Sequence, residues 1–466
     1  MSGSTGQGRT DGADKGQDAP SILVIGGGIA GIEAALNLAE YGCKVYLVDS
    51  DASIGGLMAR LDKTFPTNYC SICIEAPKMY EVQKHPNIEL MTYAEVKRAR
   101  FKDGRFKVRI NLRPRFVDND KCKGCGKCEE ACPVEIADEL DGKIGGRRKL
   151  ISAPFPQAVP NIWVVNDDCR FCRMRDKGAC IGDCIVDCSQ CRECQIAKCV
   201  VACRKEGAEA VLLWQKQKPV DVNVDSIIIA TGVQAFVPPE GLLGYDVDPN
   251  VITGLQFERL MNAGGPTEGD IVRPSDRKHV KSVAWVQCVG RGRNDIVPYC
   301  SKVCCMAATK QAIIAKEHDK DIETTIFFRD LKVYGKGFHE FVERAKAQGT
   351  RYIKASPTQV FEDPDSGKLI VRYENIDADR YEQIEVDVLV LSIPLMAPEG
   401  NMKLAKALKV ELDENGFFKE MAPIDRPLET KVPGIFLAGS ANGPCDIADS
   451  VTKAIAASLK AVLPRK

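Results

Sequence analysis

The sequence predicts an α/β fold with two nucleotide-binding-like domains and an inserted cysteine-rich α+β domain. Three observations lead to this fold class. A strand–turn–helix–strand unit starts near residue 21, two later buried strands end in glycine-rich turns, and most of the 21 cysteines fall between them. A chain of 466 residues is also too long for one small core, so several domains are expected.

Composition narrows the class of protein. Hydrophobic residues make up 44% and charged residues 27%, as in ordinary soluble globular proteins. The 64 basic and 64 acidic residues balance, and no Lys/Arg block suits a phosphate backbone, so nucleic-acid binding is not expected. No apolar run reaches the roughly 18 residues of a membrane span. Residues 1–20 are polar and lack a secretory signal, which predicts a disordered tail on a cytoplasmic protein.

The first element is a βαβ unit written "SILVIGGGIAGIEAALNLAEYGCKVYLVDS". We expect a buried strand over 22–25, a helix over 29–41 and a second strand over 44–48. This order is the setting in which a G-x-G-x-x-G turn binds a dinucleotide.

The glycines of this unit have separate roles. Gly26 allows a tight turn, Gly28 lets a pyrophosphate approach the backbone, and Gly31 lets the helix pack closely on the strand. The helix N-terminus supplies amide donors for the phosphates. Asp49, at the end of the second strand, is placed to accept hydrogen bonds from a ribose.

The cysteines next in the chain predict metal ligation. The whole chain has 21 cysteines, an odd number, and many of them are spaced as CxxC. The sequence also shows no export signal, so a disulfide framework is not expected. The insertion spans about residues 119–208 and opens with "CKGCGKCEEACP". This is the ferredoxin run C-x2-C-x2-C-x3-C-P, here Cys122, Cys125, Cys128 and Cys132, and it predicts a 4Fe–4S cluster. Zinc is the rival, but structural zinc sites usually use two separated CxxC pairs.

The partner half of this ferredoxin-like domain is "CSQCRECQIAKCVVACRKEG". By position, a second cluster is expected on Cys132, Cys191, Cys194 and Cys199. Cys203 would return to the first cluster, although no proline follows it, and Cys188 competes as a ligand.

Between the two halves lies a third group of cysteines, with the spacing C-x2-C-x7-C-x3-C. It consists of Cys169, Cys172, Cys180 and Cys184. The spacing suits another 4Fe–4S cluster or a zinc, and the sequence leaves both open.

Two stretches outside the insertion resemble the two-domain flavoproteins of the glutathione-reductase and thioredoxin-reductase type. They are "VDSIIIATGVQAF", with Ala230, Thr231 and Gly232, and "VPGIFLAGSANGPCDIADSV" near the C-terminus. The resemblance implies a thioredoxin-reductase-like fold that binds FAD, rather than NAD, at the first glycine turn. Further candidates for cofactor binding are Gly56, Gly439 and Asp446.

These segments divide the chain into expected domains. The FAD-binding domain is built from residues 21–118, 209–244 and 391–466, interrupted by the iron–sulfur insertion at 119–208 and by a second nucleotide-binding-like domain at 245–390.

Motifs in one order along the chain give a more specific resemblance. They are "LDKTFPTNYCSICIEAPKM", "CKGCGKCEEACP", "FPQAVPN", "QCVGRGRN", "PYCSKVCCMAATKQA" and "GPCDIADSV". The series resembles the HdrA family of heterodisulfide reductases. That family includes the flavoprotein of quinone-interacting oxidoreductases and the HdrA-like subunit of class II benzoyl-CoA reductase complexes.

This resemblance implies cofactors and site residues. Members bind FAD and several 4Fe–4S clusters, one of them on residues that match Cys288, Cys300, Cys304 and Cys305. A lysine that matches Lys310 is placed beside the flavin. Three clusters are therefore expected here, and a fourth is left open. Full-length members have an added N-terminal domain and a C-terminal ferredoxin domain, which this sequence does not include.

The function that follows is electron transfer within a complex, by flavin-based bifurcation or by relay between subunits. Expected partners are ferredoxin-like, HdrB- or HdrC-like, and hydrogenase- or NADH-oxidising subunits, with a dimer inside the larger assembly. The alternative is a self-contained NAD(P)H-dependent reductase, which would need a second intact glycine motif after the strand at 283–286. The sequence offers "CVGRGRND" and cysteines there.

Cys70 and Cys73 remain open as a redox dithiol, partial ligands or flavin-pocket residues.

Overall fold

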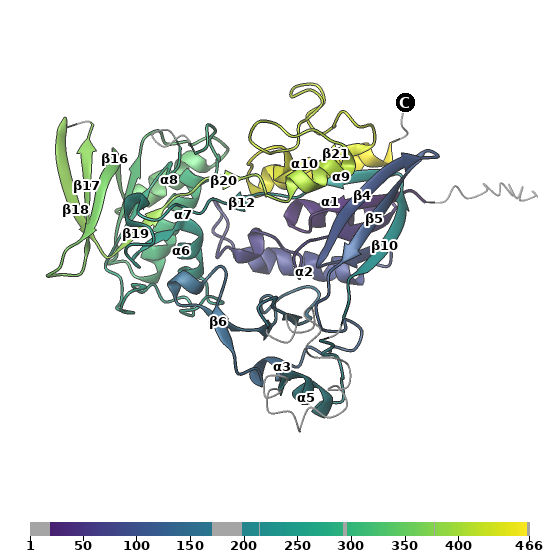
Figure 1. Cartoon of the computed structure of the whole chain (residues 1–466). Helices are drawn as coiled ribbons and strands as arrows, with labels where there is room; N and C mark the ends of the chain where they lie inside the picture. Colours follow the sequence, from purple (N-terminus) through teal and green to yellow (C-terminus); the bar gives the residue numbers. More distant parts are fainter. Residues whose placement is uncertain (1–18, 170–197, 214, 292–295, 377, 464–466) are drawn as a thin grey trace, which may run out of the picture.

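Five parallel strands, drawn from three distant stretches of the chain, form the first sheet (Figure 1). The structure is a computed structural model that describes residues 19–169, 198–213, 215–291, 296–376 and 378–463. The sheet order is β21-β11-β1-β2-β3. These strands are β1 (Ser21–Ile25), β2 (Lys44–Val48), β3 (Ile88–Met91), β11 (Ser226–Ile229) and β21 (Ile435–Leu437). They are short and apolar, as expected for parallel strands covered on both faces.

Helices cover one face of this sheet, and a smaller antiparallel sheet covers the other. The helices are α1 (Ile29–Glu40), α2 (Ser71–Lys84) and α10 (Ile447–Val462), and α1 packs along α10. The antiparallel sheet has the order β10-β5-β4 and lies beside α9. Its elements are β4 (Ala94–Lys102), β5 (Arg105–Leu112), β10 (Lys218–Val224) and α9 (Asn401–Leu408). The two apolar cores between these layers hold the three chain segments together.

A seven-stranded sheet of order β13-β19-β14-β15-β16-β17-β18 builds the second lobe (Figure 1). In this order, the strands from β13 to β16 pair in parallel. Strands β16, β17 and β18 pair in antiparallel fashion, so β16 belongs to both parts. The strands are β13 (Val251–Thr253), β14 (Ser282–Val286), β15 (Glu323–Phe328), β16 (Arg351–Glu362), β17 (Leu369–Asn375), β18 (Arg380–Val386) and β19 (Val388–Leu391). The helices of this lobe are α6 (Gly254–Met261), α7 (Cys304–His318) and α8 (Phe338–Ala347). The two lobes are joined by a short ladder between β12 (Gln234–Ala235) and β20 (Leu395–Met396).

The cysteine-rich insertion forms a third, smaller lobe at the bottom of Figure 1. Its described elements are α3 (Lys127–Glu130), β6 (Glu135–Ala137), β7 (Arg147–Lys149), β8 (Ile151–Ser152), β9 (Val164–Val165) and α5 (Lys198–Lys205). Strand β6 pairs with β7 and β8 with β9, both antiparallel. The core of the lobe mixes apolar side chains such as Trp163 with buried cysteines. The molecule is therefore the α/β flavoprotein-type fold with an α+β insertion that the sequence predicts.

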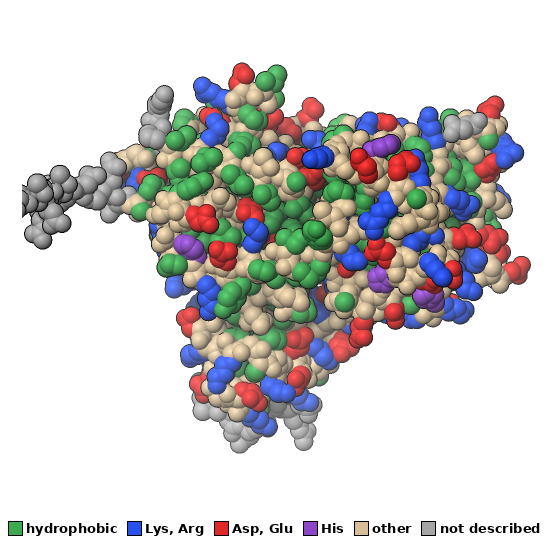
Figure 2. Space-filling model, turned by 180° about the vertical axis from the view of Figure 1, so that it is seen from behind, with side chains coloured by type: hydrophobic (Ala, Val, Ile, Leu, Met, Phe, Trp, Pro, Cys, Tyr) green, Lys and Arg blue, Asp and Glu red, His purple; other side chains and the backbone are tan. Residues whose placement is uncertain are grey.

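The surface carries both signs of charge. Figure 2 shows Lys/Arg and Asp/Glu side chains interspersed over this face, with apolar side chains gathered over the lobe that holds the five-stranded sheet. Within the residues that the structure describes, no helix combines the length and the apolar character that crossing a bilayer requires.

Candidate functional site

The glycine turn after β1 is packed so that only glycine fits at two positions. Gly26 has φ +108°, and a Cβ there would overlap the Ala230 carbonyl. A Cβ on Gly31 would overlap the Gly26 carbonyl, so helix α1 can lie directly on the turn. Gly28, the N-cap of α1, is different because a Cβ there would have no neighbour nearer than 3.9 Å. This open helix N-terminus fits a phosphate group.

A second glycine pair lies against this turn. The Gly55 amide donates to the Gly27 carbonyl at 2.7 Å. Gly56 has φ +56°, and a Cβ on it would come within 3.0 Å of the Gly28 Cα. The cradle beside Gly28 thus has two backbone walls and no side chain between them, which suits a pyrophosphate that must approach the backbone closely.

Asp49 lies half-buried at the end of β2, beside the cradle. Its carboxylate accepts hydrogen bonds from the Gly27 amide and, at 2.6 Å, from the Asp51 amide. Burial, followed by the charge of Asp51, raises the pKa of Asp49 to about 7. A ribose hydroxyl donated to this carboxylate would favour its ionised form, so the residue fits the role that the sequence predicts.

The later glycine-rich segments close over the same turn. The Ala230 amide donates to Ile25, and the Thr231 hydroxyl donates to Asn401 Oδ1 at 3.0 Å. Gly232 has φ +67° with open space where a Cβ would be. Gly439 has φ +58°, and its missing Cβ leaves room for Ala30 of α1.

Asp446 has a structural task that the sequence did not indicate. It is the N-cap of α10, and its carboxylate accepts a hydrogen bond from the Asp449 amide at 2.8 Å. One oxygen is therefore engaged by the helix. Its predicted role in cofactor binding stays a prediction.

Lys310 lies on α7 with 1% of its surface exposed and forms a buried ion pair. Its Nζ is 2.6 Å from Glu258 Oε1 on α6 and donates to the Lys63 carbonyl at 2.7 Å. Glu258 also accepts from the Asp62 amide at 3.1 Å and from Gln311 Nε2 at 2.6 Å. Because residues 62 and 63 follow the glycine cradle, Lys310 joins the second lobe to the FAD-type lobe. Placement beside a flavin stays a prediction.

Glu258 could not be found from the sequence. In "LQFERLM" it lies between an apolar residue and Arg259, and no motif marks it as buried. Only the packing of α6 against α7 places its carboxylate beside Lys310.

Four cysteines of the second lobe line one cavity at the end of β14. They are Cys288, Cys300, Cys304 and Cys305. Cys288 has φ +60° directly after the strand, and Cys304 begins α7. Burial first, and then the neighbouring thiols, raise the pKa of Cys304 to about 12. The pKa of Cys305 rises to about 11, again mainly by burial.

The surroundings of this cavity favour ligated thiolates. Arg291, Lys302 and Lys332 line it, and backbone amides donate to two of its sulfurs. These are Lys302 N to Cys300 Sγ at 3.4 Å and Lys332 N to Cys305 Sγ at 3.5 Å. Four thiols that line one cavity would repel one another as thiolates, whereas iron ions would compensate that charge. The donor set therefore fits an iron–sulfur cluster.

The insertion brings a second group of cysteines together. Cys122, Cys125, Cys128 and Cys203 line one cavity, as the ferredoxin pattern predicts. Burial, followed by the thiols of Cys199, Cys203 and Cys122, raises the pKa of Cys128 to about 12. Cys203 Sγ accepts from the Ala210 amide at 3.1 Å.

A third group of cysteines in the structure differs from the groups that the spacing predicts. Burial, and then Cys169 and Cys132, raise the pKa of Cys199 to about 12. Cys169, which the spacing assigns to a separate cluster, thus lies near two ligands expected for the second one. The remaining cysteines of these predicted groups, Cys172, Cys180, Cys184, Cys191 and Cys194, lie outside the described residues.

The thiols do not converge as ligands of a single ion do. Within the described part of the chain, no three or more His, Cys, Asp or Glu side chains are arranged to hold one metal ion. Zinc would require its ligands within about 2.3 Å of one point. Four cysteines that line one cavity are the donor set that a 4Fe–4S cluster uses.

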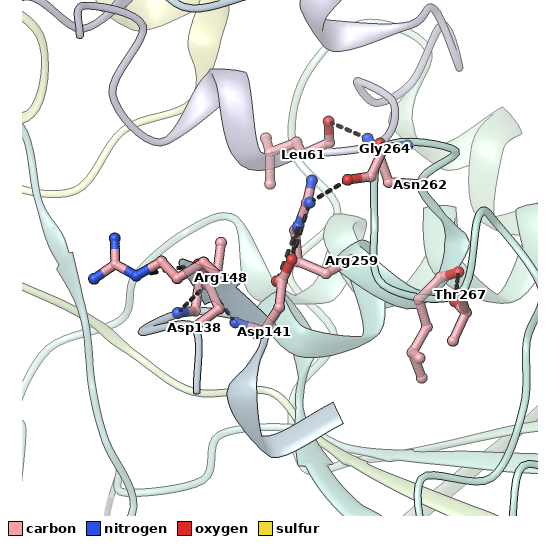
Figure 3. A network of polar contacts seen from close by, with 10 residues as sticks. Leu61, Asp138, Asp141, Arg148, Arg259, Asn262, Gly264 and Thr267 are labelled. Carbon is pink, nitrogen blue, oxygen red and sulfur yellow. Dashed lines mark hydrogen bonds and ion pairs between the residues drawn. The ribbon is translucent and has the colours of Figure 1, made fainter. Parts of the chain in front are cut away.

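The insertion is fastened to the second lobe by a polar network (Figure 3). Arg259 of α6 forms a bidentate pair with Asp141, with distances of 3.0 Å from Nε and from Nη2. Both side chains are largely buried. Asn262 donates to the Leu61 carbonyl at 3.2 Å. The network therefore links all three lobes where the loop after the cradle passes between them.

Comparison with known proteins agrees with the two kinds of site. Residues 21–71 match the family of FAD dependent oxidoreductases, and residues 115–137 match the 4Fe-4S binding domain. The thioredoxin reductase of T. acidophilum superposes with a TM-score of 0.49 at 14% identity, covering 96% of this chain and 98% of that one.

Curated relatives are closer in sequence. The HdrA-type subunit of the H(2):CoB-CoM heterodisulfide,ferredoxin reductase of Methanothermobacter thermautotrophicus is 42% identical over 95% of this chain and 63% of its own length. The corresponding iron-sulfur subunit of the CoB--CoM heterodisulfide reductase of Methanocaldococcus jannaschii is 43% identical over 95% of this chain and 64% of its own length. The chain thus spans slightly less than two thirds of these relatives. The chain is therefore similar, over about 95% of its length, to the A subunits of heterodisulfide reductases, and parts of it match an FAD oxidoreductase family and a 4Fe–4S binding domain.

Proposed function

We propose that this chain is the FAD- and 4Fe–4S-carrying electron-transfer subunit of an HdrA-like complex. It would either split electron pairs by flavin-based bifurcation or relay them between partner subunits. The observation that carries the proposal is the four-cysteine cavity after β14. A two-domain reductase would bind its pyridine nucleotide at this strand end, whereas this chain places thiols there.

The residues of the first lobe would bind and orient FAD. The Gly28 turn and the Gly56 loop would hold its pyrophosphate, and Asp49 would accept a ribose hydroxyl. The segments at 230–232 and 439–446 would close over the cofactor. Bound FAD would exchange electron pairs while the clusters carry single electrons, so no side-chain nucleophile is required.

The cysteine groups support three clusters. One would use the cavity of Cys288, and one would use Cys122, Cys125, Cys128 and Cys203. A third would use Cys132 and Cys199, with Cys169 or cysteines from 172–194 as its other ligands. A fourth cluster would have to come from that same stretch.

The proposal extends to partners and location. An electron-transfer protein of this kind needs other redox subunits, of the ferredoxin-like, HdrB- or HdrC-like, hydrogenase or NADH-oxidising kind, and we propose a dimer within that assembly. Thiol-ligated clusters suit a reducing compartment, which supports a cytoplasmic location. The balanced, interspersed charges give no basis for nucleic-acid binding (Figure 2).

Cofactor content tests this proposal directly. Flavin, iron and acid-labile sulfide are quantified on protein purified without oxygen. We expect one FAD and about twelve irons per chain, because each cubane holds four. Less than one flavin, or fewer than about eight irons, would contradict the proposal.

A single substitution tests the four-cysteine cavity. Cys304→Ala should lose about four irons and one paramagnetic cluster signal, while the ferredoxin-type signals and FAD remain. The control is Cys445→Ala, since Cys445 is a buried cysteine outside the cavity whose sulfur contacts the Ser440 and Ser450 hydroxyls. If both variants keep the same iron as the unmodified chain, Cys304 is not a ligand.

A further inference from the structure

Cys70 and Cys73 are joined by a disulfide at the start of α2. Cys70 is the N-cap of the helix, and its Sγ accepts a hydrogen bond from the Cys73 amide at 3.3 Å. The Cys73 side chain is exposed. A sulfur at a helix N-terminus is stabilised as a thiolate by the helix dipole and the free amides. The pair therefore has one solvent-facing sulfur and one sulfur suited to leave as a thiolate.

Buried polar atoms around the pair provide a second, independent observation. Ser71 Oγ and both carboxyl oxygens of Glu75 have no hydrogen-bond partner among the described residues, and both residues are 0% exposed. Positions four apart share a helix face, so Glu75 and Ser71 lie together on the buried face of α2, and Cys73 lies on its exposed face. Burial raises the pKa of Glu75 well above its ordinary value. A buried carboxyl without a hydrogen-bond partner among the described residues thus lies on the first two turns of the helix that begins at the disulfide.

The pair is attached to the boundary between the lobes. Cys70 forms an antiparallel bridge with Lys63, whose carbonyl accepts from Lys310. Phe65 packs edge-on against Phe338 of the second lobe, with ring centroids 5.8 Å apart. Since this bond spans only three positions, the chain entropy that it removes from the unfolded state is small compared with that removed by a long-range disulfide. Stabilisation of the fold does not account for it.

We propose that Cys70 and Cys73 form a redox-active thiol–disulfide site that exchanges electron pairs with a small-molecule thiol. The small-molecule thiol, as its thiolate, attacks the exposed Cys73 sulfur. The bond between the two cysteines breaks, and Cys70 leaves as a thiolate. A second thiolate attacks the external sulfur of the mixed disulfide. This second attack releases Cys73 as a thiolate, which takes up a proton. Two thiols are oxidised to one disulfide, and the protein disulfide is reduced to two thiols.

The test uses the full chain in its holo form. Tryptic cleavage after Lys63 and Lys78 releases residues 64–78, which contain these two cysteines and no other. Protein purified without reductant is alkylated and digested, and the mass of the 64–78 peptide is measured by mass spectrometry. We expect the disulfide form at first, and two alkyl groups after equilibration with dithiothreitol or glutathione, with a two-electron Nernst dependence. FAD and iron content should not change.

Single variants test the roles of the two sulfurs. With glutathione disulfide, Cys70→Ser should trap an adduct on Cys73. In Cys73→Ser, Cys70 should react with iodoacetamide about tenfold faster than Cys73 does in Cys70→Ser, because the helix stabilises its thiolate. Cys43→Ser, which removes a buried cysteine of the same lobe, should leave the mass of the 64–78 peptide and its titration unchanged.

Three results would overturn the proposal. The peptide could carry two free thiols before any reductant is added, or the disulfide could resist reduction in the folded chain. The double variant Cys70→Ser/Cys73→Ser could also lose about four irons, which would make the pair cluster ligands.

Discussion

At the scale of single residues, Asp49 is unusual because its carboxylate lies beside an open cradle, and the nearby Arg60 lowers its pKa less than burial and Asp51 raise it. It accepts two backbone amides, yet burial and Asp51 still raise its pKa to about 7. The flavin-free fold therefore favours the protonated carboxyl at low pH, and a ligand that needs the ionised form must compete with that proton.

This competition predicts a pH-dependent affinity for FAD. We expect FAD to bind about tenfold more weakly at about pH 6 than at about pH 8, because the ionised fraction of a group with this pKa changes by that factor. Quenching of flavin fluorescence on titration of FAD-free chain measures the affinity. The Asp49→Asn variant should bind FAD weakly, and its affinity for FAD should not depend on pH in this range. The same dependence in the variant would assign it to another group.

The Lys310–Glu258 pair concentrates charge where the lobes meet. Both side chains are only 2% exposed. A buried pair contributes little net stability, but removing one partner leaves an uncompensated charge.

Lys310→Met should therefore lower the free energy of unfolding by about 3–5 kcal/mol, measured by urea denaturation of the holo chain. Lys320→Met changes an exposed lysine nearby and should stay within about 0.5 kcal/mol of the unmodified chain. The double variant Lys310→Met/Glu258→Gln should recover part of the loss. Equal stability of the Lys310 and Lys320 variants would contradict a buried charge pair. A shifted flavin potential in Lys310→Met would additionally support the predicted position beside FAD.

At the scale of elements, helix α7 connects two chemical features. It begins at Cys304 in the four-cysteine cavity, and Lys310 lies about 9 Å further along its axis at 1.5 Å per residue. A rigid helix thereby fixes the spacing between the proposed cluster and the segment at 62–63. Helix α6 has a similar connecting role through Arg259 and Asp141.

Loss of the α6 contact should loosen the insertion alone. Arg259→Ala leaves Asp141 without its bidentate partner, so amide hydrogen exchange should become faster over residues 135–149 and remain unchanged in the five-stranded sheet. Arg109→Ala removes an exposed pair with Asp221 and serves as the control, since such pairs contribute about 0–1 kcal/mol. Unchanged exchange over 135–149 would show that other contacts hold the insertion.

At the scale of the whole molecule, the arrangement resembles a two-domain reductase whose second lobe has exchanged a nucleotide loop for thiols. The parallel part of the seven-stranded sheet remains, but β14 is followed by Cys288 and the cysteine cavity. The sequence there has Gly290 and Gly292 but Asp295 in place of the third glycine of a G-x-G-x-x-G turn, so the motif that binds a pyridine nucleotide is incomplete.

NADH should therefore fail to reduce the isolated chain. We expect no rapid bleaching of the flavin absorbance on anaerobic addition of NADH without partner subunits, whereas dithionite should bleach it. Rapid bleaching by NADH alone would favour the self-contained reductase over the proposed role in electron transfer within a complex.

Local patterns were sufficient for the fold class and for much of the cofactor chemistry. The glycine turn, the ferredoxin cysteine run and the later glycine-rich strands each depend on residues close in sequence, where steric limits and ligand spacing act directly. The exact domain boundaries and the full ligand sets proposed from these patterns remain predictions.

The sequence by itself therefore determined that this chain is an FAD- and iron–sulfur-type α/β protein, because periodicity and short motifs encode backbone geometry. Only the tertiary structure decided which distant groups meet. It placed Cys169 near Cys199, Glu258 against Lys310 and Arg259 against Asp141. It also joined Cys70 to Cys73, which the CxxC spacing left open. Such contacts depend on how helices and lobes pack, and that packing is set by the summed burial of many apolar side chains rather than by any local signal.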